Sequence, residues 1–134
     1  MSKPAVIMVK DVMKTEFDIV DGVCSVRQAL SVMEHVETKC LIVDKKDKQD
    51  EYGIVVIGDI ARLVLAVDRS PDRVSIYEIM TKPAVTVHPE MDIRNASLLF
   101  SRLHLSRAPV VDQGKVVGII SYTDMVMKGL LKFV

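Results

Sequence analysis

The chain carries two imperfect copies of one sequence pattern, and this repeat constrains its fold more than any other feature. The segment Gly118-Ile119-Ile120-Ser121-Tyr122-Thr123-Asp124 matches Gly53-Ile54-Val55-Val56-Ile57-Gly58-Asp59, which lies 65 residues upstream. The match continues before each heptapeptide, where Asp11-Val12-Met13 corresponds to Glu78-Ile79-Met80 at an offset of 67. This period is longer than that of the common solenoid repeats, so we expect two copies of a small α/β unit packed as one body rather than an open array.

Length and charge exclude several classes of protein. A chain of 134 residues buries roughly two-thirds of its unfolded surface, which predicts one compact domain with one core. Eighteen basic residues balance eighteen acidic ones, a composition that argues against a general nucleic-acid binder and against a polybasic membrane anchor. No apolar run approaches the length of a membrane span, and the N-terminus lacks the pattern of a secretion signal. We therefore expect a cytoplasmic protein.

The residues that bind metals or perform catalysis show no productive spacing. Cys24 and Cys40 have neither a CxxC motif nor a matching His spacing, so idle thiols are favoured over a zinc site, with a disulfide between them left open. The three histidines, His35, His88 and His104, fall on different predicted elements. No Walker-type loop and no GxSxG motif is present. The sequence predicts neither a metal requirement nor an enzyme.

Each copy has the same predicted order of elements, β-α-β-β-α, which defines a mixed α/β fold. In the first copy, Ser25 is expected to cap a helix whose apolar residues recur from Val26 to Val36. The other predicted elements of this copy are a short strand at 17–20, strands at 40–43 and 52–57 joined by a charged loop at 44–51, and a helix from Asp59 to Val67.

The second copy is predicted to repeat this order after a turn-rich connector at 68–73. A strand at 84–87 leads to a helix that begins after Asp92. Strands at 108–111 and 116–120 are joined by a tight turn at Gln113-Gly114. The last helix is expected to start at Thr123.

This arrangement resembles the CBS domain family, named from cystathionine β-synthase, whose members occur as tandem pairs. The resemblance extends from about Val9 to about Leu130 and rests on the GhhxxxD motif in both copies, on Val85-Thr86-Val87-His88-Pro89, and on Arg107-Ala108-Pro109-Val110-Val111-Asp112. It implies CBS repeats at residues 9–68 and 76–132, packed by pseudo-twofold symmetry into one globular module. It also implies two clefts, in which many members hold an adenosine-containing ligand.

The residues that end the second copy's last strand suit a nucleoside phosphate on chemical grounds. A carboxylate at Asp124 accepts two hydrogen bonds from neighbouring ribose hydroxyls. Ser121 and Thr123, together with N–H groups of the first helical turn, are candidates for phosphate. Ile119 offers an apolar edge to a base, and Gly118 permits a close backbone approach.

The resemblance adds residues to this site. It implies an opposing wall formed by Met13, by the region of Asp18, and by Thr38. Lys39 and Arg107 hold matching positions before the middle strands, where family members often place basic residues for phosphate. Arg107 is the stronger candidate, because its planar guanidinium matches phosphate oxygens.

Helix capping is the alternative interpretation of the motif. Ser121-x-x-Asp124 is also a capping-box pattern, in which the hydroxyl and the carboxylate stabilise a helix start. In the first copy, Val56 and Gly58 replace Ser121 and Thr123, so a second cleft is expected to bind weakly or to stay empty. Its predicted residues are Asp59, Ile54, Val85 and Ser106, with Arg107 as a shared candidate.

The leading functional hypothesis is a regulatory adenine-nucleotide sensor. AMP is the first candidate ligand and ADP or ATP the next, while S-adenosylmethionine or a dinucleotide would use the same carboxylate. The alternative is a ligand-independent dimerisation module for a partner enzyme or transporter, and an enzyme acting on small nucleotides is the most distant candidate. A homodimer is expected under both leading hypotheses, because apolar positions of the last helix are expected at the surface: Met127, Leu130, Leu131 and Phe133.

Overall fold

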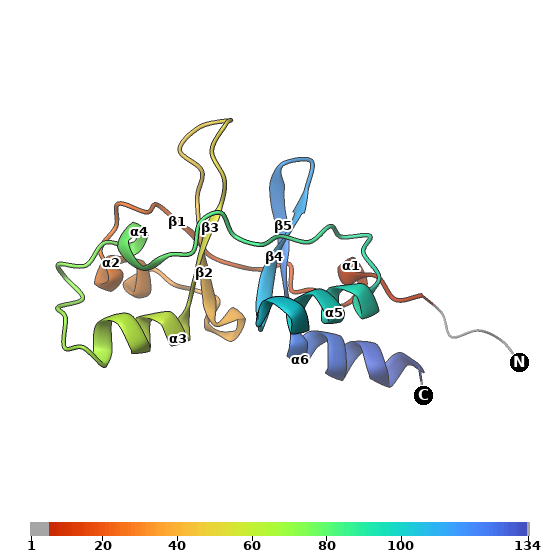
Figure 1. The fold of residues 1–134 in the computed structure, drawn as a ribbon. Coiled ribbons are helices and arrows are strands. Elements are labelled where there is room, and N and C mark those ends of the chain that lie inside the picture. Colours follow the sequence, from red (N-terminus) through yellow and green to blue (C-terminus); the bar gives the residue numbers. More distant parts are fainter. Residues whose placement is uncertain (1–5, 134) are drawn as a thin grey trace, which may run out of the picture. The chain divides into compact units, whose positions relative to one another are not determined.

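The computed structural model describes residues 6–133, which fall into two compact units (Figure 1). One unit is formed by residues 17–84, and the other by the N-terminal residues up to 16 together with residues 85 onward. The units therefore differ from the sequence copies. Helix α1 (Val9–Val12) opens the first copy but belongs to the unit of the second, while α4 (Ile76–Ile79) opens the second copy but belongs to the unit of the first.

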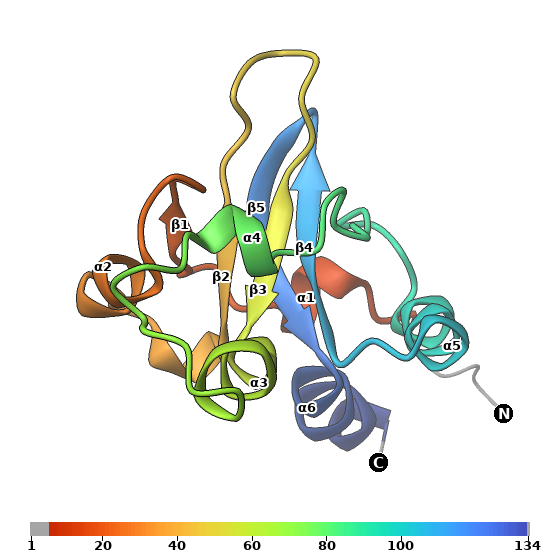
Figure 2. The ribbon, with the colours of Figure 1, turned by 60° about the vertical axis from the view of Figure 1, so that its left-hand side comes forward.

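Residues 17–84 form a three-stranded sheet in the order β1-β2-β3. The strands are β1 (Ile19–Val20), β2 (Cys40–Val43) and β3 (Gly53–Val56). β1 runs parallel to β2, and β2 pairs antiparallel with β3, so that Val43 faces Gly53 across the charged loop. This confirms the predicted hairpin, whose loop extends well beyond the two strands (Figures 1 and 2).

Helix α2 (Val26–Ser31) starts where the sequence predicts and ends early. Ser25 Oγ accepts the Gln28 N–H at 3.1 Å, and Gln28 Oε1 accepts the Ser25 N–H at 2.9 Å, which completes a capping box. The prediction that the helix continues to Val36 is wrong, because Val36 lies in a short 3-10 turn, η1 (Val36–Thr38). Both oxygens of Asp18 accept backbone N–H groups, those of residues 34 and 35, at 2.9 Å. These bonds replace helical hydrogen bonds and end α2.

The last helix of each copy begins as an α-helix and continues as a wider π-helical segment. In the first copy, α3 (Ile57–Ile60) starts two residues before the predicted Asp59 and leads into η2 (Ala61–Leu65). In the second copy, α6 (Tyr122–Asp124) leads into η3 (Met125–Gly129) and η4 (Leu130–Phe133). The side chain of Phe133 lies outside the described residues.

In the other unit, strands β4 (Arg107–Asp112) and β5 (Lys115–Ser121) form an antiparallel pair. Gln113 and Gly114 connect them with positive φ angles of 50° and 79°, as a type I′ turn requires. The predicted turn is therefore confirmed. Helix α5 (Ile93–Leu103) begins after Asp92, whose side chain accepts the Arg94 N–H at 2.8 Å.

The strand predicted at 84–87 is reduced to a single bridge between Val87 and Val110. The Val111 N–H donates to the Val87 carbonyl at 2.9 Å, and the Val87 N–H donates to the Pro109 carbonyl at 3.1 Å. If the parallel ladder continued, the next hydrogen bond would run from the N–H of residue 109 to the Val85 carbonyl. Proline has no N–H, so the ladder stops there.

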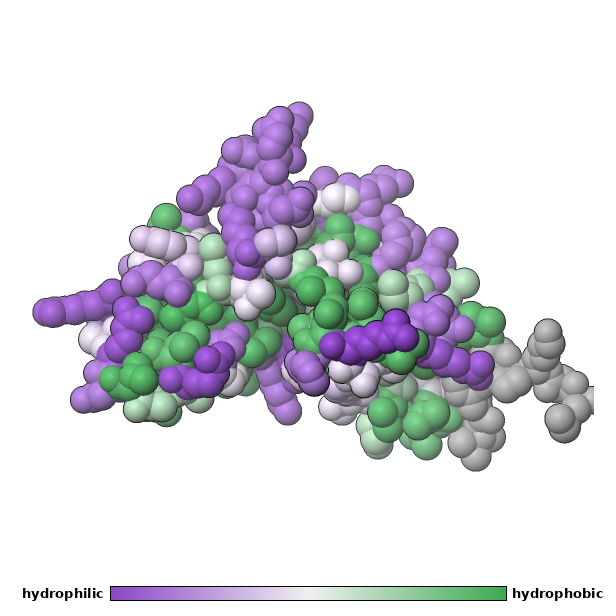
Figure 3. All heavy atoms as spheres, viewed as in Figure 1, coloured by the Kyte–Doolittle hydropathy of each residue, from purple (hydrophilic) through white to green (hydrophobic). Residues whose placement is uncertain are grey.

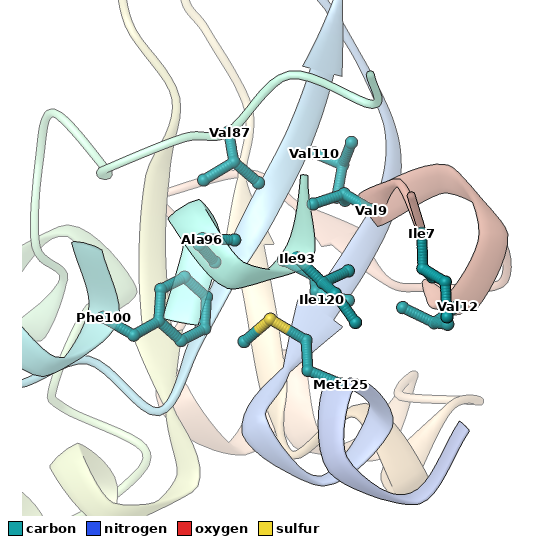
Figure 4. Packing of buried hydrophobic residues seen from close by; sticks show 11 residues of the cluster. Ile7, Val9, Val12, Val87, Ile93, Ala96, Phe100, Val110, Ile120 and Met125 are labelled. Carbon is teal, nitrogen blue, oxygen red and sulfur yellow. The ribbon is translucent and has the colours of Figure 1, made fainter. Parts of the chain in front are cut away.

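Most of the buried hydrophobic side chains form two clusters, one in each unit, and not the single core that chain length predicts. Figure 4 shows one cluster, in which side chains from α1, α5, β4, β5 and η3 meet around Ile93 and Ile120. The other cluster joins β1, β2 and β3 to α2, η2 and α4, with Leu41 and Ile76 among its fully buried members. Each unit therefore buries its own apolar faces.

Two further expectations from the sequence concern membrane-spanning helices and the two cysteines. Within residues 6–133, no helix has the length and apolar character needed to cross a membrane. Cys24, which is half-buried, and Cys40, which is buried, are reduced thiols.

Candidate functional site

Asp124 lies at the point where β5 ends and α6 begins, and its side chain is only 4% exposed. Ser121 is the residue that caps this helix. Its Oγ accepts the backbone N–H of Asp124 at 3.2 Å and donates to Asp124 Oδ2 at 3.0 Å. The capping bond predicted from Ser121-x-x-Asp124 is confirmed. The carboxylate therefore contacts the cap residue of its own helix and is also held by groups from outside the helix end.

The ammonium of Lys14 is the principal partner of this carboxylate. Lys14 Nζ lies 2.7 Å from Asp124 Oδ1 and 2.8 Å from Oδ2, with 26% of its side chain exposed. A second ammonium, that of Lys128, lies 3.4 Å from Oδ1 one helical turn further along the chain. Two cations therefore surround one buried anion, which makes this cluster positive by one charge.

Sequence reasoning did not identify Lys14 or Lys128 as site residues. Lys14 follows the Asp11-Val12-Met13 motif directly, at a position where the second copy has Thr81. This difference between the two copies is the sequence feature that could have identified Lys14 as a site residue. Lys128 stands four residues after Asp124, a spacing that favours ion pairs on helices.

The backbone of Lys14 is fixed beside β5. Its N–H donates to the Ile119 carbonyl and its carbonyl accepts the Ile119 N–H, both at 2.9 Å. A Cβ atom on Gly118 would lie 2.6 Å from the Lys14 carbonyl oxygen and 2.6 Å from Met13 Sδ. The close approach predicted at Gly118 therefore brings in the protein's own N-terminal segment, which explains why glycine is required there.

Four further candidate residues lie in the same unit as Asp124. Arg107 is the cross-strand partner of Ser121 in the β4–β5 register, and its Nε donates to Ser106 Oγ at 3.4 Å. Thr123 is exposed on the first turn of α6, and Ile119 is buried. Arg107 and Ser121 thus pair at the end of β5 next to Asp124, whereas Met13 lies beside Gly118 in the middle of the strand.

The remaining candidates for the first cleft belong to the unit formed by residues 17–84, where two of them support local structure. The carboxylate of Asp18 holds the backbone after α2, as described above. Thr38 is buried, and its hydroxyl lies 2.8 Å from the His35 carbonyl and 3.2 Å from the Cys40 carbonyl. Lys39 is exposed and has a positive φ of 57°.

The residues predicted for the second cleft fall into both units. Asp59 and Ile54 belong to residues 17–84, whereas Val85 and Ser106 belong to the other unit. Asp59 Oδ2 accepts the Val56 N–H at 3.1 Å, and Oδ1 pairs with Arg62 at 3.0 Å. Asp59 therefore caps its own helix and pairs with an exposed cation.

The two equivalent aspartates differ although the backbone around them is the same. Ile54 forms with Thr81 the same pair of 2.9 Å backbone hydrogen bonds that Ile119 forms with Lys14. Threonine places no ammonium at this position, so Asp59 has no counterpart of the Lys14 ion pair. Of the two aspartates, only Asp124 is buried and has two ammonium groups, those of Lys14 and Lys128, within 3.4 Å.

A hollow of about 490 Å³ lies elsewhere, in the unit formed by residues 17–84. It contains none of the candidate residues. Its walls include Val20, Val43, Tyr77 and Met80 and the lysines 45, 46 and 82. Lys82 also donates a hydrogen bond to Asp50, and this bond is the main cause that lowers the pKa of Asp50 to about 2.

Curated relatives are similar in sequence to this chain along much of its length. An uncharacterized protein, MK0525, from Methanopyrus kandleri is 31% identical over 102 residues, which cover 75% of this chain and 51% of that protein. The chain thus spans about half of that relative. The L-aspartate semialdehyde sulfurtransferase of Methanocaldococcus jannaschii is 27% identical over 125 residues, which are 92% of this chain but 23% of the enzyme.

Solved structures match the fold. A hexameric CBS-CP12 protein from bloom-forming cyanobacteria superposes with a TM-score of 0.88 and 34% identity, over 93% of this chain and 69% of that one. The CBS domain pair of protein MJ0100, in complex with 5′-methylthioadenosine and S-adenosyl-L-methionine, gives a TM-score of 0.77 and 25% identity, over 96% and 99% of the two chains. The model of the CBS domain matches residues 9–66 and again residues 76–129. This chain therefore belongs to the CBS domain family and contains a tandem pair of the domain.

Proposed function

We propose that this CBS pair is a regulatory module that binds an adenosine-containing ligand beside Asp124, with AMP as the first candidate and ADP or ATP as the next. The observation that carries the proposal is the buried Asp124 carboxylate at the end of β5, held by the side chains of Lys14 and Ser121. Support comes from the MJ0100 CBS pair, whose two ligands share the adenosine group.

The chemistry of the cluster gives each residue a role in this proposal. Asp124 accepts hydrogen bonds from the two ribose hydroxyls, because a carboxylate offers two oxygens at the right spacing. Thr123 and Arg107 bind phosphate, the first through its exposed hydroxyl and the second through its guanidinium. The candidates Met13, Ile119, Asp18, Thr38 and Lys39 remain predictions for the walls of the site, as do Asp59, Ile54, Val85 and Ser106 for a second one.

Regulation follows from binding only if the ligand favours one state of the protein. A ligand shifts an equilibrium between two states by no more than its difference in affinity for them. The output then passes to another part of a longer protein or to a separate enzyme or transporter. In this proposal the CBS pair binds its ligand and does not convert it.

Isothermal titration calorimetry of the nucleotide-stripped protein with AMP, ADP and ATP tests this function. Asp124→Asn keeps the size of the side chain but removes the charge, so we expect it to weaken binding about tenfold to a hundredfold. Asp59→Asn is the matched control at the equivalent position. Absence of heat with all three nucleotides at millimolar concentration, or an equal loss in both variants, would contradict the proposal.

A ligand-independent dimerisation module is the second candidate function. Met127, Leu130 and Leu131 are 57%, 56% and 64% exposed. Figure 3 shows apolar atoms gathered over this end of the chain. The hexameric CBS-CP12 neighbour supports an assembly of more than one chain. Light scattering separates the outcomes, since this candidate requires a stable dimer without ligand and the loss of that dimer in Leu130→Glu.

A further inference from the structure

The position of the Lys14 ammonium bears on which adenosine ligand the site accepts. Nζ is nearly equidistant from the two oxygens of Asp124, at 2.7 and 2.8 Å. A pair of ribose hydroxyls that donates one hydrogen bond to each oxygen requires the same place in front of the carboxylate. The ammonium and the diol therefore compete for Asp124.

The remaining contacts of the carboxylate leave little room for both donors. Oδ2 already accepts the Ser121 hydroxyl at 3.0 Å, and Oδ1 has Lys128 at 3.4 Å. A carboxylate offers about four acceptor positions in total. Two ribose hydroxyls thus bind well only when the ammonium of Lys14 moves away from the oxygens.

The displaced ammonium needs a new anion. Only 26% of the Lys14 side chain is exposed, so water replaces the lost ion pair incompletely. A phosphate group on the same ligand would supply the missing charge, whereas an uncharged nucleoside would not. A sulfonium group would add a third positive charge beside those of Lys14 and Lys128.

We propose that Lys14 is a specificity residue that neutralises Asp124 in the ligand-free protein and pairs with a phosphate of the bound ligand. Phosphorylated adenosine compounds are thereby selected over uncharged nucleosides and over sulfonium compounds. This inference rests on the proposed function, because it requires that the ribose of the ligand binds at Asp124.

The ammonium of Lys14 moves from Asp124 to the phosphate of the ligand, while the backbone of Lys14 stays in place. Two backbone hydrogen bonds tie Lys14 to Ile119, and Gly118 packs against the same peptide. The lysine side chain carries its charge on a flexible four-carbon chain, which allows the ammonium to move between two anions. Thr81, the second copy's residue at this position, holds the equivalent place beside Ile54, so no lysine at this position faces Asp59.

Titrations with AMP, adenosine and S-adenosylmethionine test this inference in the wild type and in Lys14→Thr, which installs the residue that the second copy has at this position. We expect the wild type to bind AMP about tenfold or more tightly than adenosine, as one charge-assisted contact implies. In Lys14→Thr this ratio falls several-fold, because AMP binding weakens while adenosine meets less competition, and Arg107 retains the rest of the preference for phosphate. Lys128→Met, which removes an equal charge, changes the ratio much less.

The outcomes separate the inference from the function on which it rests. If no adenosine compound binds to the wild type, both are overturned. If AMP binds but its ratio to adenosine is the same in Lys14→Thr, the function stands and the role of Lys14 is wrong. A merely structural lysine would weaken both ligands equally. Lys14→Gln keeps the length of the side chain and gives the same test if Lys14→Thr fails to fold.

Discussion

The Lys14 ammonium lies 2.7 Å from Asp124 Oδ1, although 110 residues separate the two along the chain. The contact exists because α1 belongs to the unit of the second copy, where the Lys14 backbone pairs with Ile119. The exchange of the leading helices thus places a residue of the first copy beside the motif of the second. One consequence concerns stability and can be measured without any ligand.

Removal of the cation should cost more stability than removal of the anion. Lys14→Thr leaves a carboxylate that is 4% exposed with only Ser121 and the more distant Lys128 as partners. We expect a loss of about 2 to 3 kcal/mol in the free energy of unfolding. Asp124→Ala leaves an ammonium on a flexible side chain that is 26% exposed, so water replaces part of the lost ion pair, and we expect a loss of about 1 to 2 kcal/mol. Urea denaturation measures both.

A double-mutant cycle completes this measurement. Lys14→Thr with Asp124→Ala should cost no more than Asp124→Ala alone, which gives a coupling energy of at least about 2 kcal/mol. Additive losses would show that the pair contributes nothing. The same cycle on Asp59 and Arg62 serves as the control, because Arg62 is exposed and such pairs contribute about 1 kcal/mol or less.

Two glycines of the repeated motif should respond to alanine with opposite signs. In Gly118→Ala the new Cβ would lie 2.6 Å from a backbone oxygen, that of Lys14, so we expect a loss of about 3 kcal/mol in the free energy of unfolding. Gly58 lies in α3, and a Cβ there meets no atom within 4 Å. Gly58→Ala should therefore stabilise the protein by about 0.5 to 1 kcal/mol through helix propensity.

Thermal melting of the two glycine variants provides the check. A melting midpoint that is lower in Gly58→Ala than in the wild type would contradict the open space found around Gly58. An unchanged midpoint in Gly118→Ala would mean that the N-terminal segment moves away from β5 without loss.

Local signals in the sequence were sufficient for most elements of the fold. The cap at Ser25, the helix start after Asp92 and the turn at Gln113-Gly114 depend on side chains and φ preferences of adjacent residues, and all three are confirmed. The repeat and its motif also identified the family. These features depend on short stretches of chain, which is why the sequence alone predicts them.

The failures share a different cause, since each depends on a contact between distant residues. Asp18 ends α2 from sixteen and seventeen residues away. The ion pair of Asp124 depends on which unit contains α1, and neither the hydrophobic periodicity nor the spacing of the motifs predicts this. Lys14 was therefore not predicted, although the resemblance implied that Met13, its neighbour in the first copy, contributes to the same site.

The pH dependence of the loop at 44–51 follows from the lowered pKa of Asp50. Hydrogen bonds, first from Lys82 and then from the Lys46 N–H, lower this pKa from 3.8 to about 2. Because the folded pKa lies below the unfolded one, the stabilisation is complete above pH 3.8 and is lost as the pH falls toward 2. Lys82→Met should raise the pKa of Asp50 and weaken this dependence.

Carbon-13 NMR titration of the Asp50 carboxyl measures the effect directly. Lys82→Arg retains the positive charge and is the control, with a pKa expected to stay low. A pKa of about 2 in Lys82→Met would mean that the backbone donors alone hold the carboxylate in its charged form.

Pro109 explains why the strand predicted at 84–87 is a single bridge, and its replacement should extend that strand. In Pro109→Ala, residue 109 gains an N–H that points toward the Val85 carbonyl, in register with the bond from Val111 to Val87. We expect this new amide to be protected from hydrogen exchange to a degree similar to that of Val111. Rapid exchange at residue 109 with Val111 still protected would show that the segment stays apart for another reason, and that proline is not the cause of the short ladder.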